Sequence, residues 1–338
     1  MPGKTIKHYT IPVFIPELAC PFQCVFCNQR KISGTEHIPE LDDIKKTIET
    51  HLSTIDPLSN IEIGFFGGNF TGIPVEHQEM LLSLANNYTR CNKGVKAIRI
   101  STRPDYIDHD TLRRLKKYNV KTIELGAQSL DEDVLRLSGR GHKAEDIFKA
   151  SEMIRKEGFS LGLQMMIGLP GDTLEKSLYT AGKIIELGAD NTRIYPTLVI
   201  RDTKLESLFI KGKYIPLSLD TAVNWSKEIL KRFEIANVNV IRMGLHPSEG
   251  LLNGESLVCG PFHISFRELV LTEIWHDMLL PVTKMKGSKV EIHINPKEFN
   301  YAVGYNAKNK KTLEQNFRYV RFNGDYNLNE REFRAYFS

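Results

Sequence analysis

Three of the five cysteines in this chain lie close together, as Cys20, Cys24 and Cys27. Thiolates at this CxxxCxxC spacing can bind one metal centre, but three of them do not complete a tetrahedral zinc site or a four-cysteine iron–sulfur site. The spacing therefore predicts a metal centre with one position open to another ligand. Two alternatives are a zinc site completed by a distant residue, for example His37 or Cys91, and a loop of buried cysteines without a metal.

Polar or glycine-containing segments follow the predicted strands further along the chain. Glycines there would let a ligand approach the backbone, an arginine could pair with a carboxylate, and Ser or Gln could hydrogen-bond a ribose hydroxyl. Each candidate also has an ordinary structural interpretation, such as a helix cap, a buried amide bonded to a neighbouring strand end, or simple packing. The candidate binding residues in or after these strands are Gly67, Gly68, Asn69, Ser101, Arg103, Gln128, Arg140 and Gln164. Tyr195 is a possible catalytic group, with ordinary packing as the favoured alternative.

Strand-like and helix-like segments alternate through the first two thirds of the chain. Apolar runs predict strands at residues 8–16, 60–66, 97–102, 122–127, 160–169 and 192–200. Helical spacing of apolar residues predicts helices at 41–55, 78–88, 110–118, 144–156 and 174–187. This alternation is typical of parallel βαβ units, whose ligands bind at the carboxyl ends of the strands. The first strand is followed by the cysteine segment. A Rossmann sheet would have a GxGxxG motif at this position. Its absence favours an α/β fold with an open, partial (β/α)6 barrel.

The pattern changes after residue 217. A long helix at 219–235, a strand at 238–243, a helix at 262–280 and strands at 289–295 and 301–305 are predicted. We therefore expect a core at residues 1–215 and a C-terminal α+β extension at 216–338, packed on the core as a possible substrate-binding cap. Residues 296–338 contain eight Lys or Arg against five Asp or Glu, interleaved with aromatic side chains.

Composition limits the class of protein. Apolar residues make up 41% and charged residues 25% of the chain, as in ordinary globular proteins. No apolar run reaches the roughly 18–20 residues of a membrane span, and no signal peptide is recognisable, so no membrane partner is expected. An odd number of cysteines, three of them clustered, argues against a disulfide framework and favours a reducing cytoplasm. The net charge of +4 permits a nucleic-acid partner without requiring one.

Together these motifs resemble the radical SAM superfamily, and more closely the radical SAM core of the Elongator catalytic subunits. The resemblance lies in the residue identities and the order of the motifs, over roughly residues 9–240. The matching segments are Ser101-Thr-Arg-Pro-Asp-Tyr106, Gly126-Ala-Gln-Ser129, Arg140-Gly-His142, Ile194-Tyr-Pro-Thr-Leu-Val-Ile-Arg201 and Lys213-Tyr214.

The resemblance implies an oxygen-sensitive 4Fe-4S cluster on Cys20, Cys24 and Cys27, with S-adenosylmethionine (SAM) over the open iron. It also implies that Phe26 flanks the adenine and that Gln128, Arg140 and Gln164 contact SAM. Such an enzyme would take one electron from a donor such as flavodoxin or ferredoxin, cleave SAM to a 5′-deoxyadenosyl radical and abstract hydrogen from a substrate.

The resemblance and the basic, aromatic tail favour tRNA as the substrate. A porphyrin precursor or another metabolite is the alternative, and a non-catalytic iron–sulfur or SAM-binding redox protein is a further one. Two departures separate the chain from the Elongator subunits: its gap between the first two cysteines is shorter, and no acetyltransferase domain is expected after the core. Cys259 is an additional candidate as a hydrogen donor or cluster ligand, although a lone cysteine more often has neither role.

Overall fold

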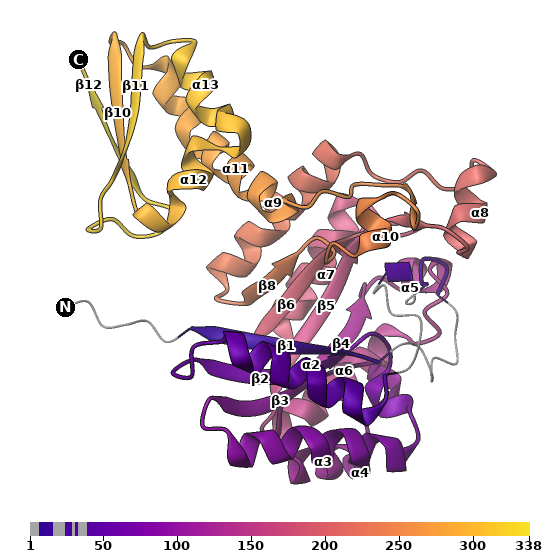
Figure 1. Ribbon diagram of the computed structural model, residues 1–338. Coiled ribbons are helices and arrows are strands. Elements are labelled where there is room, and N and C mark those ends of the chain that lie inside the picture. The colour runs from indigo at the N-terminus through magenta and orange to yellow at the C-terminus, as the bar shows by residue number, and fades with distance from the viewer. Residues whose placement is uncertain (1–6, 16–23, 29–30, 33–38) are drawn as a thin grey trace.

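The main element of the fold is a curved sheet of seven parallel strands in the order β1-β2-β3-β4-β5-β6-β8 (Figure 1). The computed structural model describes residues 7–15, 24–28, 31–32 and 39–338. The strands of this sheet are β1 (His8–Phe14), β2 (Asn60–Phe66), β3 (Val95–Thr102), β4 (Val120–Gln128), β5 (Ser160–Ile167), β6 (Asn191–Pro196) and β8 (Asn239–Met243). The sheet is a half-barrel, which confirms the predicted partial barrel. It includes one strand more than the six expected, because β8 continues the parallel pairing beside β6.

Helices cover the outer face of the half-barrel because each strand alternates between apolar and polar side chains. In β3, for example, Ile98 and Ile100 are fully buried, and the intervening residues Arg99 and Ser101 point into the barrel. The covering and connecting helices are α2 (Leu41–Thr54), α3 (Val75–Cys91), α4 (His109–Lys117), α5 (Glu132–Leu137), α6 (Ala144–Lys156), α7 (Leu174–Glu186), α8 (Lys204–Ile210) and α9 (Leu219–Ile235).

Two short helices, α5 and α8, were not predicted, although both carry capping signals. The side chain of Asp131 accepts a hydrogen bond from Val134 N at the start of α5, and Thr203 caps α8 in the same way. Such caps satisfy amide groups that have no partner within the helix. A helix of six or seven residues gives too little periodicity to be recognised from the apolar pattern alone.

The strand predicted at 192–200 is instead two strands. The parallel strand β6 ends at Pro196, and β7 (Val199–Ile200) pairs antiparallel with β9 (Leu257–Cys259). The strand predicted at 301–305 is wrong: residues Phe299–Val303 form helix α12, and Ala302 is fully buried in the C-terminal core. Packing of this helix against its neighbours overrides the local alternation that suggested a strand.

The C-terminal module has a hydrophobic core of its own. Its elements are α11 (Phe266–Leu279), β10 (Lys289–Ile294), α12, α13 (Lys308–Glu314), β11 (Tyr319–Gly324) and β12 (Phe333–Phe337), with short 3-10 turns between them. The short helix α10 (Glu249–Leu252) precedes the module, and its Leu251 packs beside the barrel with Leu198 and Ile200. The three strands form a separate sheet in the order β11-β10-β12, and the helices cover one of its faces (Figure 1). Trp275 of α11 is fully buried in this second core. Among the described residues, no helix is long and apolar enough to cross a membrane.

The buried outer face of the barrel gives a prediction about stability. Replacing Ile98 by Ala deletes fully buried side-chain atoms in β3 and should lower the free energy of unfolding by about 2–5 kcal/mol in a denaturant titration. The matched control is Ile210→Ala in α8, whose side chain is 73% exposed and whose loss should change stability by less than about 0.5 kcal/mol. Equal effects of the two substitutions would contradict the assignment of the core.

Candidate active site

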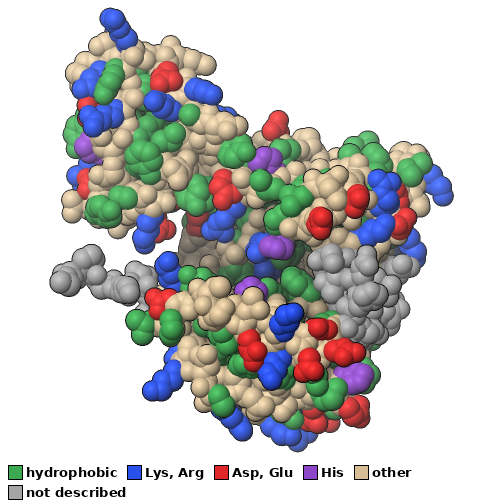
Figure 2. Space-filling view, viewed as in Figure 1, with side chains coloured by type: hydrophobic (Ala, Val, Ile, Leu, Met, Phe, Trp, Pro, Cys, Tyr) green, Lys and Arg blue, Asp and Glu red, His purple; other side chains and the backbone are tan. Residues whose placement is uncertain are grey.

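The interior of the half-barrel encloses a cavity of about 1050 Å³. Figure 2 shows the hollow between the barrel and the C-terminal elements, with basic and histidine side chains inside it. The lining extends from Cys24, Phe26 and Cys27 of the cysteine segment to Arg242 of β8 and Arg267 of α11. Nearly every strand of the main sheet contributes a lining side chain, so the whole half-barrel shapes one site.

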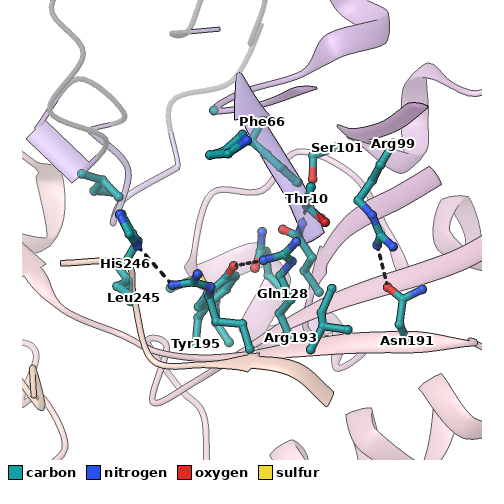
Figure 3. A pocket seen from close by; sticks show the side chains of 18 of the residues that line it. Thr10, Phe66, Arg99, Ser101, Gln128, Asn191, Arg193, Tyr195, Leu245 and His246 are labelled. Carbon is teal, nitrogen blue, oxygen red and sulfur yellow. Dashed lines mark hydrogen bonds between the residues drawn. The ribbon is translucent and has the colours of Figure 1, made fainter. Parts of the chain in front are cut away.

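The strand period of two places the polar residues on this inner face. In β3 the inward side chains are Arg99 and Ser101, in β5 Gln164 and Met166, and in β6 Arg193 and Tyr195. In β5, Gln164 and Met166 are only half-buried and face the cavity. Figure 3 shows Arg99, Arg193 and Tyr195 directed into the same space.

An ion-pair network crosses the floor of the cavity. Arg99 donates to Glu62 on one side and to Glu124 on the other, with N–O distances of 2.9 Å and 2.8 Å. Arg193 donates to both carboxylate oxygens of Glu124, at 2.6 Å and 2.9 Å. Two carboxylates and two guanidinium groups from strands β2, β3, β4 and β6 therefore neutralise one another inside the barrel.

The arginines keep Glu124 ionised although its side chain is fully buried. Burial by itself raises the pKa of this carboxyl, but the hydrogen bonds and charge of Arg193, followed by the charge of Arg99, lower it to about 2. Burial also opposes ionisation of Glu62, and His8 and Arg99 lower the pKa of that carboxyl below its usual range. At neutral pH the network holds two negative and two positive charges.

The cysteine segment lies at the carboxyl end of the strands. Cys24 and Phe26 are buried, and the backbone of Val25 is held by hydrogen bonds to Ser138 and Leu205. Cys20 lies outside the described residues, so the predicted three-thiol set is not tested. Within the described residues, His, Cys, Asp and Glu side chains form no group of three that could hold a metal.

Arg140 connects the cysteine segment to the end of β4. One guanidinium nitrogen donates to the Cys24 sulfur at 3.2 Å, and another donates to the carbonyl oxygen of Gly126 at 2.6 Å. A Cβ atom at Gly126 would lie 3.1 Å from the Gln128 amide nitrogen and 3.3 Å from Arg140, so a glycine favours this close packing. Gln128 itself adopts a left-handed backbone conformation with φ of 67°, which is unusual for a non-glycine residue.

Two buried polar atoms beside Cys24 have no hydrogen-bond partner among the described residues. They are Nε of Arg140 and Oε1 of Gln128. Buried polar atoms without a partner are uncommon and costly, so a bound polar group is a natural partner for them. The strained backbone, the glycine cradle and these two atoms fit a ligand with a carboxylate or hydroxyl groups next to the cysteines.

The other predicted residues fall into two groups. Gly67 and Gly68 line the cavity directly, and Gly67 has a positive φ of 97°. Gln164 lines it too, but its amide donates to Ser101 at 2.7 Å and to Glu124 at 2.8 Å. The Gln164 amide is therefore hydrogen-bonded to side chains of neighbouring strands, which was the structural alternative to ligand binding.

Asn69 and Arg103 contact other protein groups. The Asn69 side chain accepts a hydrogen bond from Thr102 at 2.7 Å, and Arg103 donates to both oxygens of Asp105 and to the backbone carbonyl of Arg140. Arg103 thus supports the backbone of Arg140. A direct contact of either residue with a ligand stays a prediction.

Tyr195 points into the cavity, as its strand position predicts. Its hydroxyl lies 3.5 Å from an Arg193 nitrogen, and burial raises the pKa of the phenol, so it is protonated at neutral pH. Cys259 packs against the apolar cluster that surrounds Cys24 and Phe26. Neither observation tests a catalytic role.

Sequence reasoning missed the charged residues of the cavity, although a signal for them was present. Each of the two buried ion-pair partners Arg99 and Glu124 stands between isoleucine or leucine residues within a strand, where a charge is costly without a partner. Arg242, His246 and Arg267 were also missed. They lie on elements assigned to the extension, and only the fold brings them to the cavity wall.

Comparisons with known proteins agree with this geometry. A family model described as the Radical SAM superfamily matches residues 15–184, and one described as the Radical_SAM C-terminal domain matches residues 189–276. An uncharacterized protein of Methanocaldococcus jannaschii is 32% identical over 62% of this chain and 66% of its own length. A tRNA uridine(34) acetyltransferase of Dehalococcoides mccartyi is 26% identical over 63% of this chain and 54% of that protein.

A solved structure with the same fold is that of the Elongator-type protein Elp3 from Methanocaldococcus infernus, with an N-terminal deletion. It aligns with a TM-score of 0.65 and 21% identity, over 81% of this chain and 64% of that chain. These matches confirm the resemblance to radical SAM proteins and to the Elongator core. The chain spans at most 66% of the length of the two curated relatives named above.

The buried network predicts a pH-dependent effect of one substitution. Glu124→Gln leaves Arg99 and Arg193 without their shared carboxylate and should lower the free energy of unfolding by about 3 kcal/mol or more at neutral pH. The folded-state pKa of about 2 lies below the ordinary value of 4.5, so the ionised group stabilises the protein above pH 4.5. That contribution is lost as the pH falls towards 2, and the difference between wild type and variant should narrow from about pH 5 downwards.

Denaturant titrations at several pH values measure this difference. Glu145→Gln is the matched control, since Glu145 forms an exposed ion pair with Lys149 on α6 and its loss should cost less than about 1 kcal/mol. A difference for Glu124→Gln that is small, or that does not change with pH, would show that the network does not hold an ionised carboxylate.

Proposed function

Because the chain belongs to the radical SAM superfamily, we propose that its barrel binds a 4Fe-4S cluster on Cys20, Cys24 and Cys27 together with SAM, and acts on RNA, with tRNA favoured. The family is one of enzymes, and it generally uses this cluster and this cosubstrate. When bound, the cluster would supply the electron that cleaves SAM to methionine and a 5′-deoxyadenosyl radical able to abstract hydrogen. A one-electron donor such as flavodoxin or ferredoxin would reduce the cluster.

One observation supports this proposal above the others: the cysteine segment and the polar strand ends open into the same cavity. Cys24 and Cys27 line it next to Gly67, Gly68 and Gln128. A cosubstrate bound to the open iron would therefore meet the glycine backbone and the unpaired Gln128 oxygen without any rearrangement of the strands.

Arg140 is the residue best placed to hold an anionic group beside the cysteines. Its guanidinium is buried next to the Cys24 sulfur, and its Nε still has no partner among the described residues. A carboxylate bound there would gain a charge-assisted hydrogen bond in a site with little water. In this proposal Gln128 binds a hydroxyl or the methionine end of SAM, and Phe26 packs beside the adenine.

An apolar cluster packs around Cys24 and Phe26 of the cysteine segment. Phe26, Leu169, Val199, Leu205 and Tyr214 are buried together with Cys24. Such a cluster excludes water, which would strengthen electrostatic interactions at the thiolates and protect a reactive species from quenching. The cavity is thus apolar near the cysteine segment and polar along the strands that carry the charged side chains.

Two observations favour RNA as the substrate. One relative is a tRNA uridine(34) acetyltransferase that matches 63% of this chain. In addition, Arg242, His246 and Arg267 line the cavity without belonging to the neutralised network around Glu124. Arg242 lies 3.4 Å from His246, and its charge and burial lower the pKa of that imidazole, so the excess positive charge at this wall comes from the arginines.

A small anionic metabolite is the second candidate substrate. The cavity volume of about 1050 Å³ is at the upper end of the range of pockets that hold small ligands. The same arginines would bind its carboxylates or phosphates.

The ligand assignment predicts the behaviour of two cysteine variants. After anaerobic reconstitution with iron and sulfide, the wild-type protein should show cluster absorbance and should form 5′-deoxyadenosine from SAM and dithionite. Cys24→Ala should lose both properties, because two thiolates do not hold a stable 4Fe-4S cluster. Cys91→Ala, at the exposed end of α3, is the matched control and should keep both.

Circular dichroism should show the same fold for both variants. Cluster absorbance retained in Cys24→Ala would refute the ligand assignment. Wild-type protein with an intact cluster and no 5′-deoxyadenosine would refute the proposed function.

A further inference from the structure

The C-terminal sheet has one face that no other described element covers. In β10, β11 and β12, alternate side chains point towards the helices and form the second core, which includes Val290, Ile292 and Ile294. The residues between them lie on the opposite face of the sheet, and α11, α12 and α13 do not cover that face (Figure 1). We call this outward surface the open sheet face. It includes Lys289, His293, Tyr319, Arg321, Arg334 and Tyr336.

Aromatic side chains lie exposed on this face. Tyr319 is 48% and Tyr336 is 52% exposed, and they stand on the two strands that flank β10. Between them, the His293 ring contacts Tyr336 edge-on, with ring centroids 4.9 Å apart. Rings held in place by strands on a flat, solvated surface present faces on which planar groups can stack.

The positive charge of the chain is concentrated in the same module. Residues 266–338, from the start of α11, contain 12 Lys or Arg and 9 Asp or Glu, a net charge of +3, whereas the whole chain has +4, which leaves +1 for residues 1–265. On the open sheet face Lys289 pairs with Glu291 at 2.7 Å, and Arg321 and Arg334 are exposed. The exposed arginines therefore favour an anionic partner on this face.

We propose that the open sheet face binds a single-stranded segment of RNA, with bases stacked on Tyr319 and Tyr336 and phosphates near Arg321 and Arg334. Stacking requires unpaired bases, which a duplex does not offer, and guanidinium groups contact phosphates in any sequence. This inference rests on the proposed RNA substrate and assigns it a docking surface outside the barrel.

Helix α11 connects the open sheet face to the cavity. Arg267, at the start of the helix, lines the cavity and donates to the carbonyl oxygen of Val240 at 2.9 Å. Trp275, about 12 Å further along the helix axis, is fully buried in the core beneath the C-terminal sheet. The module that would hold the RNA is thereby joined through one helix to the wall of the cavity.

Fluorescence anisotropy with a labelled oligouridylate of about twelve nucleotides tests the proposal on the full chain. Tyr336→Ala should weaken binding roughly fivefold to a hundredfold, because one base loses its stacking platform. Tyr179→Ala is a matched control, because Tyr179 on α7 is 49% exposed and Tyr336 is 52% exposed. This control should bind the oligonucleotide as well as the wild type.

A charge variant separates stacking from simple attraction between charges. Arg321→Gln should reduce the slope of log affinity against log salt by roughly 0.7, the value for one phosphate contact on a single strand. An RNA duplex of the same length should bind more weakly than the single strand.

Unchanged binding in Tyr336→Ala, or a duplex that binds as well as the single strand, would overturn the proposal. The proposal would also be overturned if the wild-type protein had no affinity for RNA and a protein bound to the open sheet face instead. Formation of 5′-deoxyadenosine, measured in the same samples, separates the two claims. Radical chemistry without RNA binding contradicts only the docking surface, and RNA binding without SAM cleavage contradicts only the proposed function.

Discussion

The buried carboxylate of Glu124 between Arg99 and Arg193 is the constraint on which the barrel interior depends. An ionised group in a protein interior is costly unless opposite charges and hydrogen bonds surround it. Here, side chains from three different strands must converge to meet that requirement, and their convergence fixes the register and curvature of β3, β4 and β6. In closed barrels of similar strands, branched apolar side chains fill the interior. In this half-barrel a polar layer takes their place, and a cavity remains above it.

This arrangement divides the cavity into regions with different chemistry. Near the cysteines, buried apolar residues and the guanidinium of Arg140 combine an apolar environment with a fixed positive charge. On the side of β8 and α11, Arg242 and Arg267 add positive charge that the Glu124 network does not neutralise. A neutralised layer between two basic regions suits a reaction that binds one charged cosubstrate and one anionic substrate without strong repulsion between their sites. The basic C-terminal module extends this electrostatic pattern outside the barrel.

Much of the fold could be predicted because its information is local. The alternation of apolar runs and helical patterns predicted a partial barrel. The strand-end positions of Gly67, Gly68 and Gln128 predicted that they lie near one another, and all three line the cavity. The rest depends on long-range packing. Residues 301–305 look like a strand in isolation, but Ala302 is buried in a helix. No local pattern shows that Arg242 and Arg267 reach the cavity. They lie on β8 and α11, and only the tertiary packing of these elements brings both side chains to the cavity wall. The charges at Arg99 and Glu124 were visible in the sequence as unusual, and their pairing could not be inferred without the register of the sheet.

The central claim is that a SAM molecule occupies the cavity beside the cysteines, next to Arg140 and Gln128. Electron paramagnetic resonance of the reconstituted, dithionite-reduced protein tests this claim most directly, because the spectrum of a reduced 4Fe-4S cluster responds to a new ligand on one iron. The account predicts a changed spectrum when SAM is added to the wild-type protein and a weaker response, requiring more SAM, in Arg140→Gln. A reduced cluster whose spectrum does not change at saturating SAM would contradict it.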